Sequence, residues 1–301
     1  MEASSAMSLA KTLTGIIPPI TMPFDDKGEL VVSAIRDQVD FIIEQGSHGM
    51  VAGGSTGEGH TLNAEEFAAS MKAVHDAIDG RVPFLAGLIN NSTKGAIERA
   101  QALKGMNVAA LQVTPVHYLF KPSADATVQH FRTIWEETGI PIIIYNVIPW
   151  NYLGIDVMLR IMDEVPGVIG MKQSAGDLKA ISDLLNRLKP DNIVLTGTDA
   201  LLYPAFSLGV HGAISALTSA VPGVTLKLWN LVKAGDHKAA LDLHYRLANL
   251  WDVLPHDNLP ACVKYCQHRQ GLPLHLPRAP MEPVSSQQKA LIDERLDALL
   301  A

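Results

Sequence analysis

Short apolar runs alternate along the chain with segments of helical period. Eight runs rich in Ile, Val and Leu each predict a strand buried on both faces: Gly15–Thr21, Gly49–Gly53, Pro83–Ile89, Ala109–Thr114, Pro141–Tyr145, Val168–Lys172, Ile193–Gly197 and Gly212–Ser215. Between them the helical period predicts helices at Val32–Gln45, Ala64–Ile78, Thr93–Leu103, Ala124–Glu137, Asp156–Glu164, Leu178–Leu188 and Ala200–Leu208. Buried strands that alternate with helices favour parallel pairing, and eight such units close a barrel. The pattern predicts the α/β class and a (β/α)8 TIM barrel.

The competing architecture is a doubly wound open sheet, which usually has a glycine-rich dinucleotide turn after its first strand. Here the first run leads into Thr21-Met22-Pro23-Phe24, which favours the barrel. Past Ser215 the pattern is helical only, at Val224–Lys233, His237–Val253, Asn258–Gln270 and Ser286–Leu300. The proline-rich segment Leu272–Pro283 is interpreted as a strap across the barrel. We predict a flexible N-terminus (1–11), a barrel (12–222) and a C-terminal helical region (223–301).

Composition and charge narrow the class of partner. The 301-residue chain has a formal net charge of -7 and no cluster of Lys and Arg, which argues against nucleic acid. Its apolar stretches fall short of the roughly 20 residues that span a bilayer, so no membrane role is predicted. The two cysteines, Cys262 and Cys266, fit packed thiols in a reduced cytoplasmic protein. The 11 histidines form no tight ligand group, so we expect a small-molecule partner and no metal.

Candidate chemistry lies where the predicted strands end, because barrels of this kind form their active sites at the carboxyl ends of the strands. Lys172 ends the sixth run and Tyr145 ends the fifth. Burial favours a neutral amine, which can attack a ketone, and a phenol can relay protons. Taken alone, Lys172 also fits a lysine that extends its amine to water. Tyr145 alone also fits a packed aromatic residue.

A glycine-rich segment, Gly53–Gly59, follows the second run and contains two hydroxyl side chains, Ser55 and Thr56. Glycines leave backbone N–H groups free to surround an anion such as a carboxylate. The segment lacks the Gly-Lys-Ser/Thr ending of a phosphate-binding loop and the spacing of a dinucleotide fingerprint. It therefore indicates a small carboxylate ligand.

Together the segments resemble the dihydrodipicolinate synthase and N-acetylneuraminate lyase family of class I, pyruvate-dependent aldolases. The matching motifs span the barrel: Gly54-Ser55-Thr56-Gly57-Glu58 with Thr61-Leu62, Thr114-Pro115, Tyr145-Asn146-Val147, Gly170-Met171-Lys172, Gly197-Thr198-Asp199 and Gly212-Ala213-Ile214-Ser215. The resemblance implies a Schiff-base lyase that acts on pyruvate or another 2-keto acid without a further cofactor. It also implies a homotetramer of barrels.

The resemblance assigns roles to individual residues. Lys172 is the implied nucleophile, Tyr145 the proton shuttle, and Ser55 with Thr56 the carboxylate clamp and relay. The remaining residues implied to lie at the substrate are Ile214, Gly197 and Asn91.

Two loops depart from the synthase branch of the family. After Tyr145 the chain has Trp150 where that branch places an arginine for the distal carboxylate of its second substrate. The loop after Thr114-Pro115 is longer, so His117 and Tyr118 become candidate substrate-binding residues, together with Trp150. These departures predict that the chain is not a true dihydrodipicolinate synthase.

Three alternatives remain beside the aldolase hypothesis. A dehydratase or hydratase-aldolase would use the same lysine imine, and Trp150 and Tyr152 would fit a substrate with an aromatic or sugar tail. Dihydrodipicolinate synthase itself is the second. The third is a keto-acid-binding sensor barrel without catalysis, because a fold does not guarantee a function.

Overall fold

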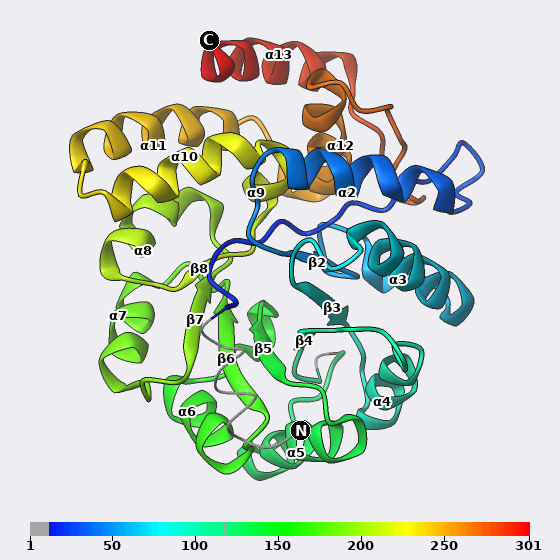
Figure 1. Ribbon diagram of the computed structural model, residues 1–301, viewed down its shortest axis with the longest axis vertical. Coiled ribbons are helices and arrows are strands. Elements are labelled where there is room, and N and C mark those ends of the chain that lie inside the picture. The colour runs from blue at the N-terminus through cyan, green and yellow to red at the C-terminus, as the bar shows by residue number, and fades with distance from the viewer. Residues whose placement is uncertain (1–11, 117) are drawn as a thin grey trace.

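The computed structural model describes residues 12–116 and 118–301, so the predicted N-terminal region 1–11 and His117 lie outside it. Eight parallel strands form one sheet in the order β1-β8-β7-β6-β5-β4-β3-β2 (Figure 1). The strands are β1 (Gly15–Ile16), β2 (Met50–Ala52), β3 (Phe84–Leu88), β4 (Ala110–Val113), β5 (Ile142–Asn146), β6 (Val168–Gln173), β7 (Ile193–Thr196) and β8 (Gly212–Ala213). The predicted TIM barrel is confirmed.

The ring closes between β1 and β2 through the residues that follow β1. Pro19 bridges Val51, and the N–H of Ile20 donates to the carbonyl of Val51 at 2.8 Å. Strand β1 is only two residues long although the apolar run reaches Thr21, because Pro18 and Pro19 have no N–H for a ladder.

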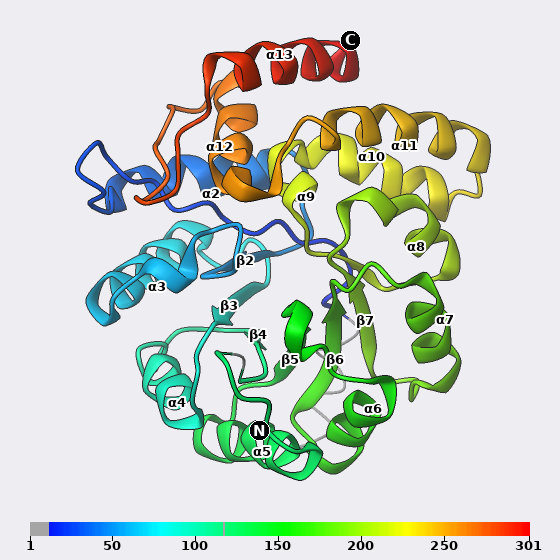
Figure 2. The same ribbon diagram turned by 180° about the vertical axis from the view of Figure 1, so that it is seen from behind.

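One helix follows each strand and packs on the outside of the ring, as the two opposite views show (Figures 1 and 2). These helices are α2 (Ile35–Glu44), α3 (Ala64–Ile78), α4 (Thr93–Gln101), α5 (Ala124–Thr138), α6 (Ile155–Glu164), α7 (Leu178–Arg187), α8 (Leu202–Leu208) and α10 (Pro222–Lys233). Helix α10 lies against β1 and α8, and so takes the place of the eighth barrel helix.

Two apolar cores hold the barrel together. Alternate strand residues fill its interior, among them Val51, Leu85, Ile143 and Ile214, which are all fully buried. Their neighbours along the strands point outward and pack against the helices in a second, larger core. The barrel is therefore a packed solid, and side chains can reach solvent from the strands mainly at the two ends.

The C-terminal region lies beside the barrel and over one edge of it (Figure 1). It comprises α11 (His237–Trp251), α12 (Leu259–Arg269), the strap (Leu272–Pro283) and α13 (Ser286–Leu300). A short helix that the sequence pattern did not predict, α9 (Ala216–Ala220), lies between β8 and α10. The strap joins the barrel where Leu276 forms a backbone bridge to Phe24. The predicted helical C-terminal extension is present.

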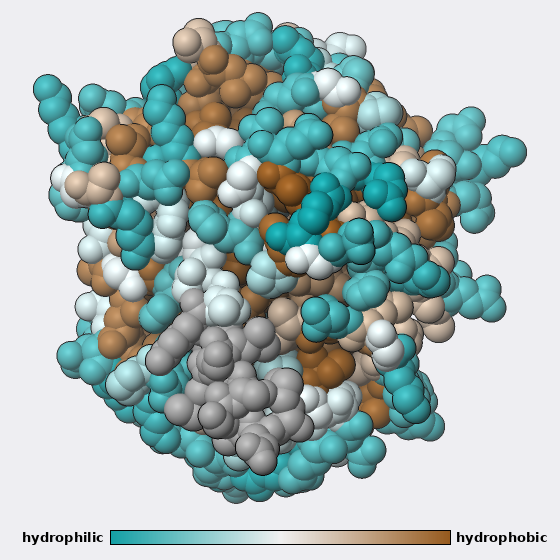
Figure 3. Space-filling view, viewed as in Figure 1, coloured by the Kyte–Doolittle hydropathy of each residue, from teal (hydrophilic) through white to brown (hydrophobic). Residues whose placement is uncertain are grey.

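No helix within the described residues is both long and apolar enough to cross a membrane. On the face drawn in Figure 3, hydrophobic side chains lie in patches between hydrophilic ones.

Candidate active site

A cavity of about 260 Å³ opens where several barrel strands end. It is lined by Ser55, Thr56, Tyr145, Val147, Pro149, Tyr152, Lys172, Ser174, Gly197, Thr198, Asp199, Ala200, Ser215, Ala216, Trp251, His256 and Leu259. Most of these residues end a strand or follow one directly, because the packed interior leaves side chains free only at the rim. Three larger cavities lie elsewhere in the described chain and include neither Lys172 nor Tyr145.

The strand register places Lys172 and Tyr145 side by side. Tyr145 pairs with Lys172 across β5 and β6, and the Lys172 Nζ atom lies 4.0 Å from the centre of the Tyr145 ring. Both side chains are almost fully buried. The hydroxyl of Tyr145 lies 3.1 Å from the Ser55 hydroxyl, so a hydrogen-bonded pair connects the phenol to the glycine-rich loop. Amine, phenol and hydroxyl thus meet in one pocket.

Gly197 makes room for the amine. A β-carbon at this position would lie 2.1 Å from the Ser174 hydroxyl oxygen and 2.6 Å from the Cε atom of Lys172. Both separations are far below ordinary contact distances, so any larger residue would displace the lysine. Gly197 is therefore the residue that lets Lys172 lie across the end of β7.

Asp199 brings a buried carboxyl group into the same pocket. It accepts hydrogen bonds from the backbone N–H groups of Leu217 at 2.6 Å and Ala216 at 3.2 Å. Burial raises the pKa of Asp199, and the hydrogen bond from Leu217 opposes that rise, as does the charge of Lys172. The sequence motif contained Asp199, but sequence reasoning gave it no role.

The pocket also includes residues that sequence reasoning missed. Trp251, His256 and Leu259 come from the C-terminal region and form one wall. No local sequence motif identifies these three residues as pocket residues, because only the fold brings the C-terminal region to the barrel rim. Tyr152 lines the pocket as well, whereas the sequence hypothesis chose Trp150 as its contact.

The remaining predicted substrate-binding residues lie outside the lining of this cavity. Ile214 is fully buried in the barrel interior, and Asn91 is exposed. Tyr118 and Trp150 are 75% and 65% exposed. His117 falls outside the described residues.

Metal ligands do not gather in this pocket or elsewhere among the described residues. No group of three or more His, Cys, Asp or Glu side chains within residues 12–116 and 118–301 could hold an ion. The two cysteines are buried in α12 as free thiols.

Beyond the pocket, a buried histidine on α5 makes stability depend on pH. Burial lowers the pKa of His130 to about 4, and its Nδ1 lies 2.9 Å from the Thr93 hydroxyl. The folded protein binds fewer protons than the unfolded chain between that value and 6.5, so stability falls as the pH drops through this window. When the pH falls from 6.5 to 5, the free energy of unfolding of the parent should decrease by about 2 kcal/mol more than that of His130→Leu. Urea unfolding at both pH values measures this, and parallel curves for the two proteins would contradict it.

Comparison with known proteins identifies relatives over nearly the whole chain. The model of the Dihydrodipicolinate synthetase family matches residues 12–299. The 4-hydroxy-tetrahydrodipicolinate synthase of Maridesulfovibrio salexigens is 32% identical over 95% of this chain and 98% of its own length.

Solved structures give the same result. A putative dihydrodipicolinate synthetase from Pseudomonas aeruginosa superposes with a TM-score of 0.91 at 27% identity, covering 95% of this chain and 99% of the other. A prophage protein of the dihydrodipicolinic acid synthase family from E. coli K12, solved in complex with pyruvate, gives 0.90 at 26% identity, covering 96% and 99%.

A barrel of this topology with these relatives is a class I lyase. The chain belongs to the Dihydrodipicolinate synthetase family.

Proposed function

We propose that the protein is a Schiff-base lyase that acts on pyruvate or a longer 2-keto acid and cleaves or forms the carbon–carbon bond between C3, the carbon beside the carbonyl, and C4. The observation that carries the proposal is the position of Lys172, buried at the end of β6 against Tyr145, whose hydroxyl contacts Ser55. The E. coli relative solved with pyruvate supports the choice of keto acid. The covalent lysine imine replaces any separate cofactor.

In the first half-reaction the amine of Lys172 attacks the keto carbon, which forms a carbinolamine. Tyr145 passes a proton to the carbinolamine hydroxyl, water leaves, and an iminium remains. The Ser55 hydroxyl, 3.1 Å from the Tyr145 hydroxyl, connects the phenol to the carboxylate side of the substrate. Ser55 and Thr56 hold the carboxylate at the glycine-rich loop.

In the second half-reaction the iminium accepts the electron pair released when the C3–C4 bond breaks. The C4 hydroxyl gives its proton to the Tyr145 oxygen, which lost one in the dehydration step, and becomes the carbonyl of an aldehyde, while the keto-acid part becomes an enamine on Lys172. Protonation of C3 and hydrolysis then return pyruvate and the free amine. Condensation follows the same steps in reverse.

The pocket lining favours an uncharged second substrate. Lys172 is the only lysine or arginine among the lining residues, and the aromatic side chains of Tyr152 and Trp251 face the same space. A distal carboxylate would therefore meet no guanidinium and would lie near Asp199. The name of the Maridesulfovibrio relative favours the synthase reaction, whereas this lining supports an aldehyde without a second carboxylate.

Product analysis tests the proposal. The enzyme is incubated with 2-keto acids that carry neutral, aromatic, polyhydroxylated or anionic tails, and products are identified by mass. Aldol cleavage releases pyruvate and an aldehyde, while dehydration keeps the carbon chain intact and indicates the dehydratase alternative. Rapid condensation of pyruvate with aspartate semialdehyde would identify a synthase. Imine formation without turnover of any substrate would indicate a sensor.

We propose further that the protein is a cytoplasmic homotetramer. Three consecutive apolar side chains after β4 are strongly exposed in the isolated chain: Tyr118 by 75%, Leu119 by 70% and Phe120 by 80%. An apolar cluster of this kind is typical of a protein–protein contact, and a second copy of the chain is its proposed partner.

Mutation of this cluster tests the assembly. The double variant Leu119→Lys/Phe120→Lys should shift the molar mass in light scattering from tetramer to a smaller species, because two buried charges would oppose the contact. Lys94→Ala, at an exposed position on α4, is the control. A parent protein that runs as a monomer would refute the assembly.

A further inference from the structure

The loop that carries Ser55 and Thr56 has an unusual conformation two residues further on. Glu58 has a φ of 54°, in the left-handed region that residues with a side chain seldom adopt, and it is fully buried. Its N–H donates to the carbonyl of Ser55 at 3.0 Å, and the N–H of Gly59 donates to that of Gly54 at 3.0 Å. The positions of Ser55 and Thr56 are therefore tied to the position of Glu58.

The Glu58 carboxylate is held by the C-terminal region. Its Oε1 accepts a hydrogen bond from the Lys264 amine on α12 at 2.6 Å, and its Oε2 accepts one from the backbone N–H of Arg278 on the strap at 2.8 Å. Lys264 is 2% exposed and also donates to the carbonyl of Leu276 at 2.7 Å. One buried ion pair thus connects the glycine-rich loop, α12 and the strap.

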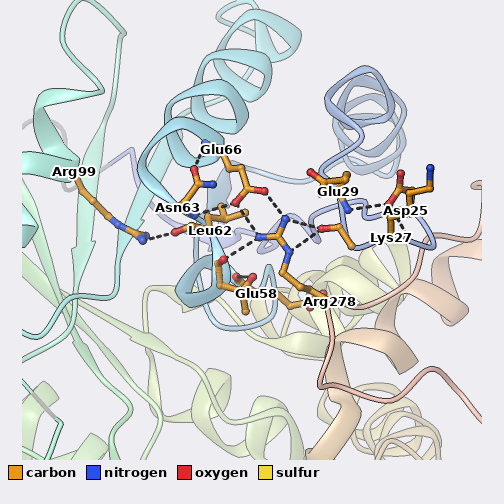
Figure 4. Close-up of polar contacts among 11 residues, drawn as sticks. Asp25, Lys27, Glu29, Glu58, Leu62, Asn63, Glu66, Arg99 and Arg278 are labelled. Atoms are coloured by element: carbon orange, nitrogen blue, oxygen red, sulfur yellow. Dashed lines mark hydrogen bonds and ion pairs between the residues drawn. The ribbon is translucent and has the colours of Figure 1, made fainter.

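A second set of contacts, nearer the surface, holds the Arg278 side chain (Figure 4). The Arg278 guanidinium donates to the carbonyls of Gly28 and Thr61 and forms an ion pair with Glu66 at the start of α3. These contacts attach the strap to the barrel without involving the Glu58 carboxylate. They provide a way to weaken the strap while leaving the buried pair in place.

A buried ion pair is a poor source of stability, because desolvation of the two charges offsets most of their attraction, and apolar residues often serve as well. Its directional hydrogen bonds do fix geometry. Here they fix a backbone turn of high energy directly beside the two hydroxyl residues that face the pocket. The pair therefore suits a positioning role better than a stabilising one.

We propose that Glu58 and Lys264 are positioning residues that hold Ser55 and Thr56 in the arrangement that grips the carboxylate of the keto acid. The C-terminal region then takes part in keto-acid recognition although Lys264 does not touch the substrate. This inference rests on the proposed Schiff-base function and names the groups that shape its carboxylate site.

The test compares two ketones that differ only in the charge of the carboxyl group. Pyruvate and methyl pyruvate are each incubated with the protein and borohydride, and the rate of adduct formation on Lys172 is followed by intact mass and peptide mapping. Lys264→Met should slow trapping of pyruvate about 10- to 100-fold, because a displaced clamp no longer meets the carboxylate. Trapping of methyl pyruvate, which lacks the anion, should change less than about twofold by the same argument.

Two further variants separate positioning from stability. Arg278→Met removes the outer ion pair with Glu66, so it should lower the melting temperature and leave the ratio of the two trapping rates unchanged. The double variant Glu58→Gln/Lys264→Met leaves no unpaired buried charge and replaces Lys264→Met if the latter fails to fold. Hydrogen exchange of residues 53–61 should accelerate in the Lys264 variants more than in Arg278→Met.

The outcomes distinguish this inference from the proposed function. A parent protein that forms no adduct with either ketone refutes the Schiff-base function and this inference with it. In a second outcome, the parent is trapped normally and the Lys264 variants slow trapping of both ketones equally, or of neither. That outcome refutes the positioning role and leaves the Schiff-base function standing.

Discussion

Replacement of Lys172 by alanine is expected to reduce turnover of the keto-acid substrate by at least about 10⁴-fold, since loss of a covalent nucleophile removes the whole reaction path. Among the described residues that line the pocket, Lys172 is the only lysine, so none of the others could replace its amine. Incubation of the parent protein with pyruvate and borohydride should add one reduced pyruvate to the intact mass, mapped to the peptide that contains Lys172. The alanine variant should gain no mass.

A surface lysine provides the control for this experiment. Lys179 on α7 is 81% exposed and pairs with Asp183 one helical turn away. Lys179→Ala should keep both the adduct and the turnover of the parent. If Lys172→Ala retained turnover, or if the adduct mapped to another lysine, the Schiff-base mechanism would have to be abandoned.

The barrel could be predicted from sequence because local and global signals agree in it. Helices α3 and α13 have the predicted bounds, since Asn63 and Ser285 begin them with capping boxes that fix the first turn. The Lys172–Tyr145 contact also follows from local information, because both residues end adjacent parallel strands. The predicted run of β1 was too long, since the prolines after Ile17 prevent a ladder there.

The rest of the site depends on contacts between distant segments. Trp251 and His256 reach the pocket only because the C-terminal helices pack over the barrel rim, and no periodicity encodes that packing. In the sequence, Lys264 has the features of an ordinary charged residue on a helix, and only the fold places it beside Glu58. Tyr152 lines the pocket and Trp150 does not, and a short 3₁₀ turn at Pro149–Asn151 separates the orientations of the two aromatic side chains. The sequence does not indicate the direction of this turn.

Tyr145→Phe is expected to lower turnover by about 10²- to 10⁴-fold, the range typical of a lost general acid–base group. The change removes one oxygen and keeps the ring, so the packing of the Lys172 amine over that ring should persist. The variant loses the hydrogen bond to the Ser55 hydroxyl and with it the path for protons to the carbinolamine. Its melting temperature should stay close to that of the parent.

Single-turnover kinetics separate this role from binding. Formation of the borohydride-trapped imine should slow in Tyr145→Phe to the same degree as overall turnover, because dehydration of the carbinolamine becomes limiting. Ser55→Ala offers a matched comparison, since it removes the same hydrogen bond from the other side and leaves the phenol in place. A proton path that begins at Tyr145 requires a larger loss for Tyr145→Phe than for Ser55→Ala. The opposite order would assign the proton transfer to the Ser55 hydroxyl and leave Tyr145 as the surface on which Lys172 packs.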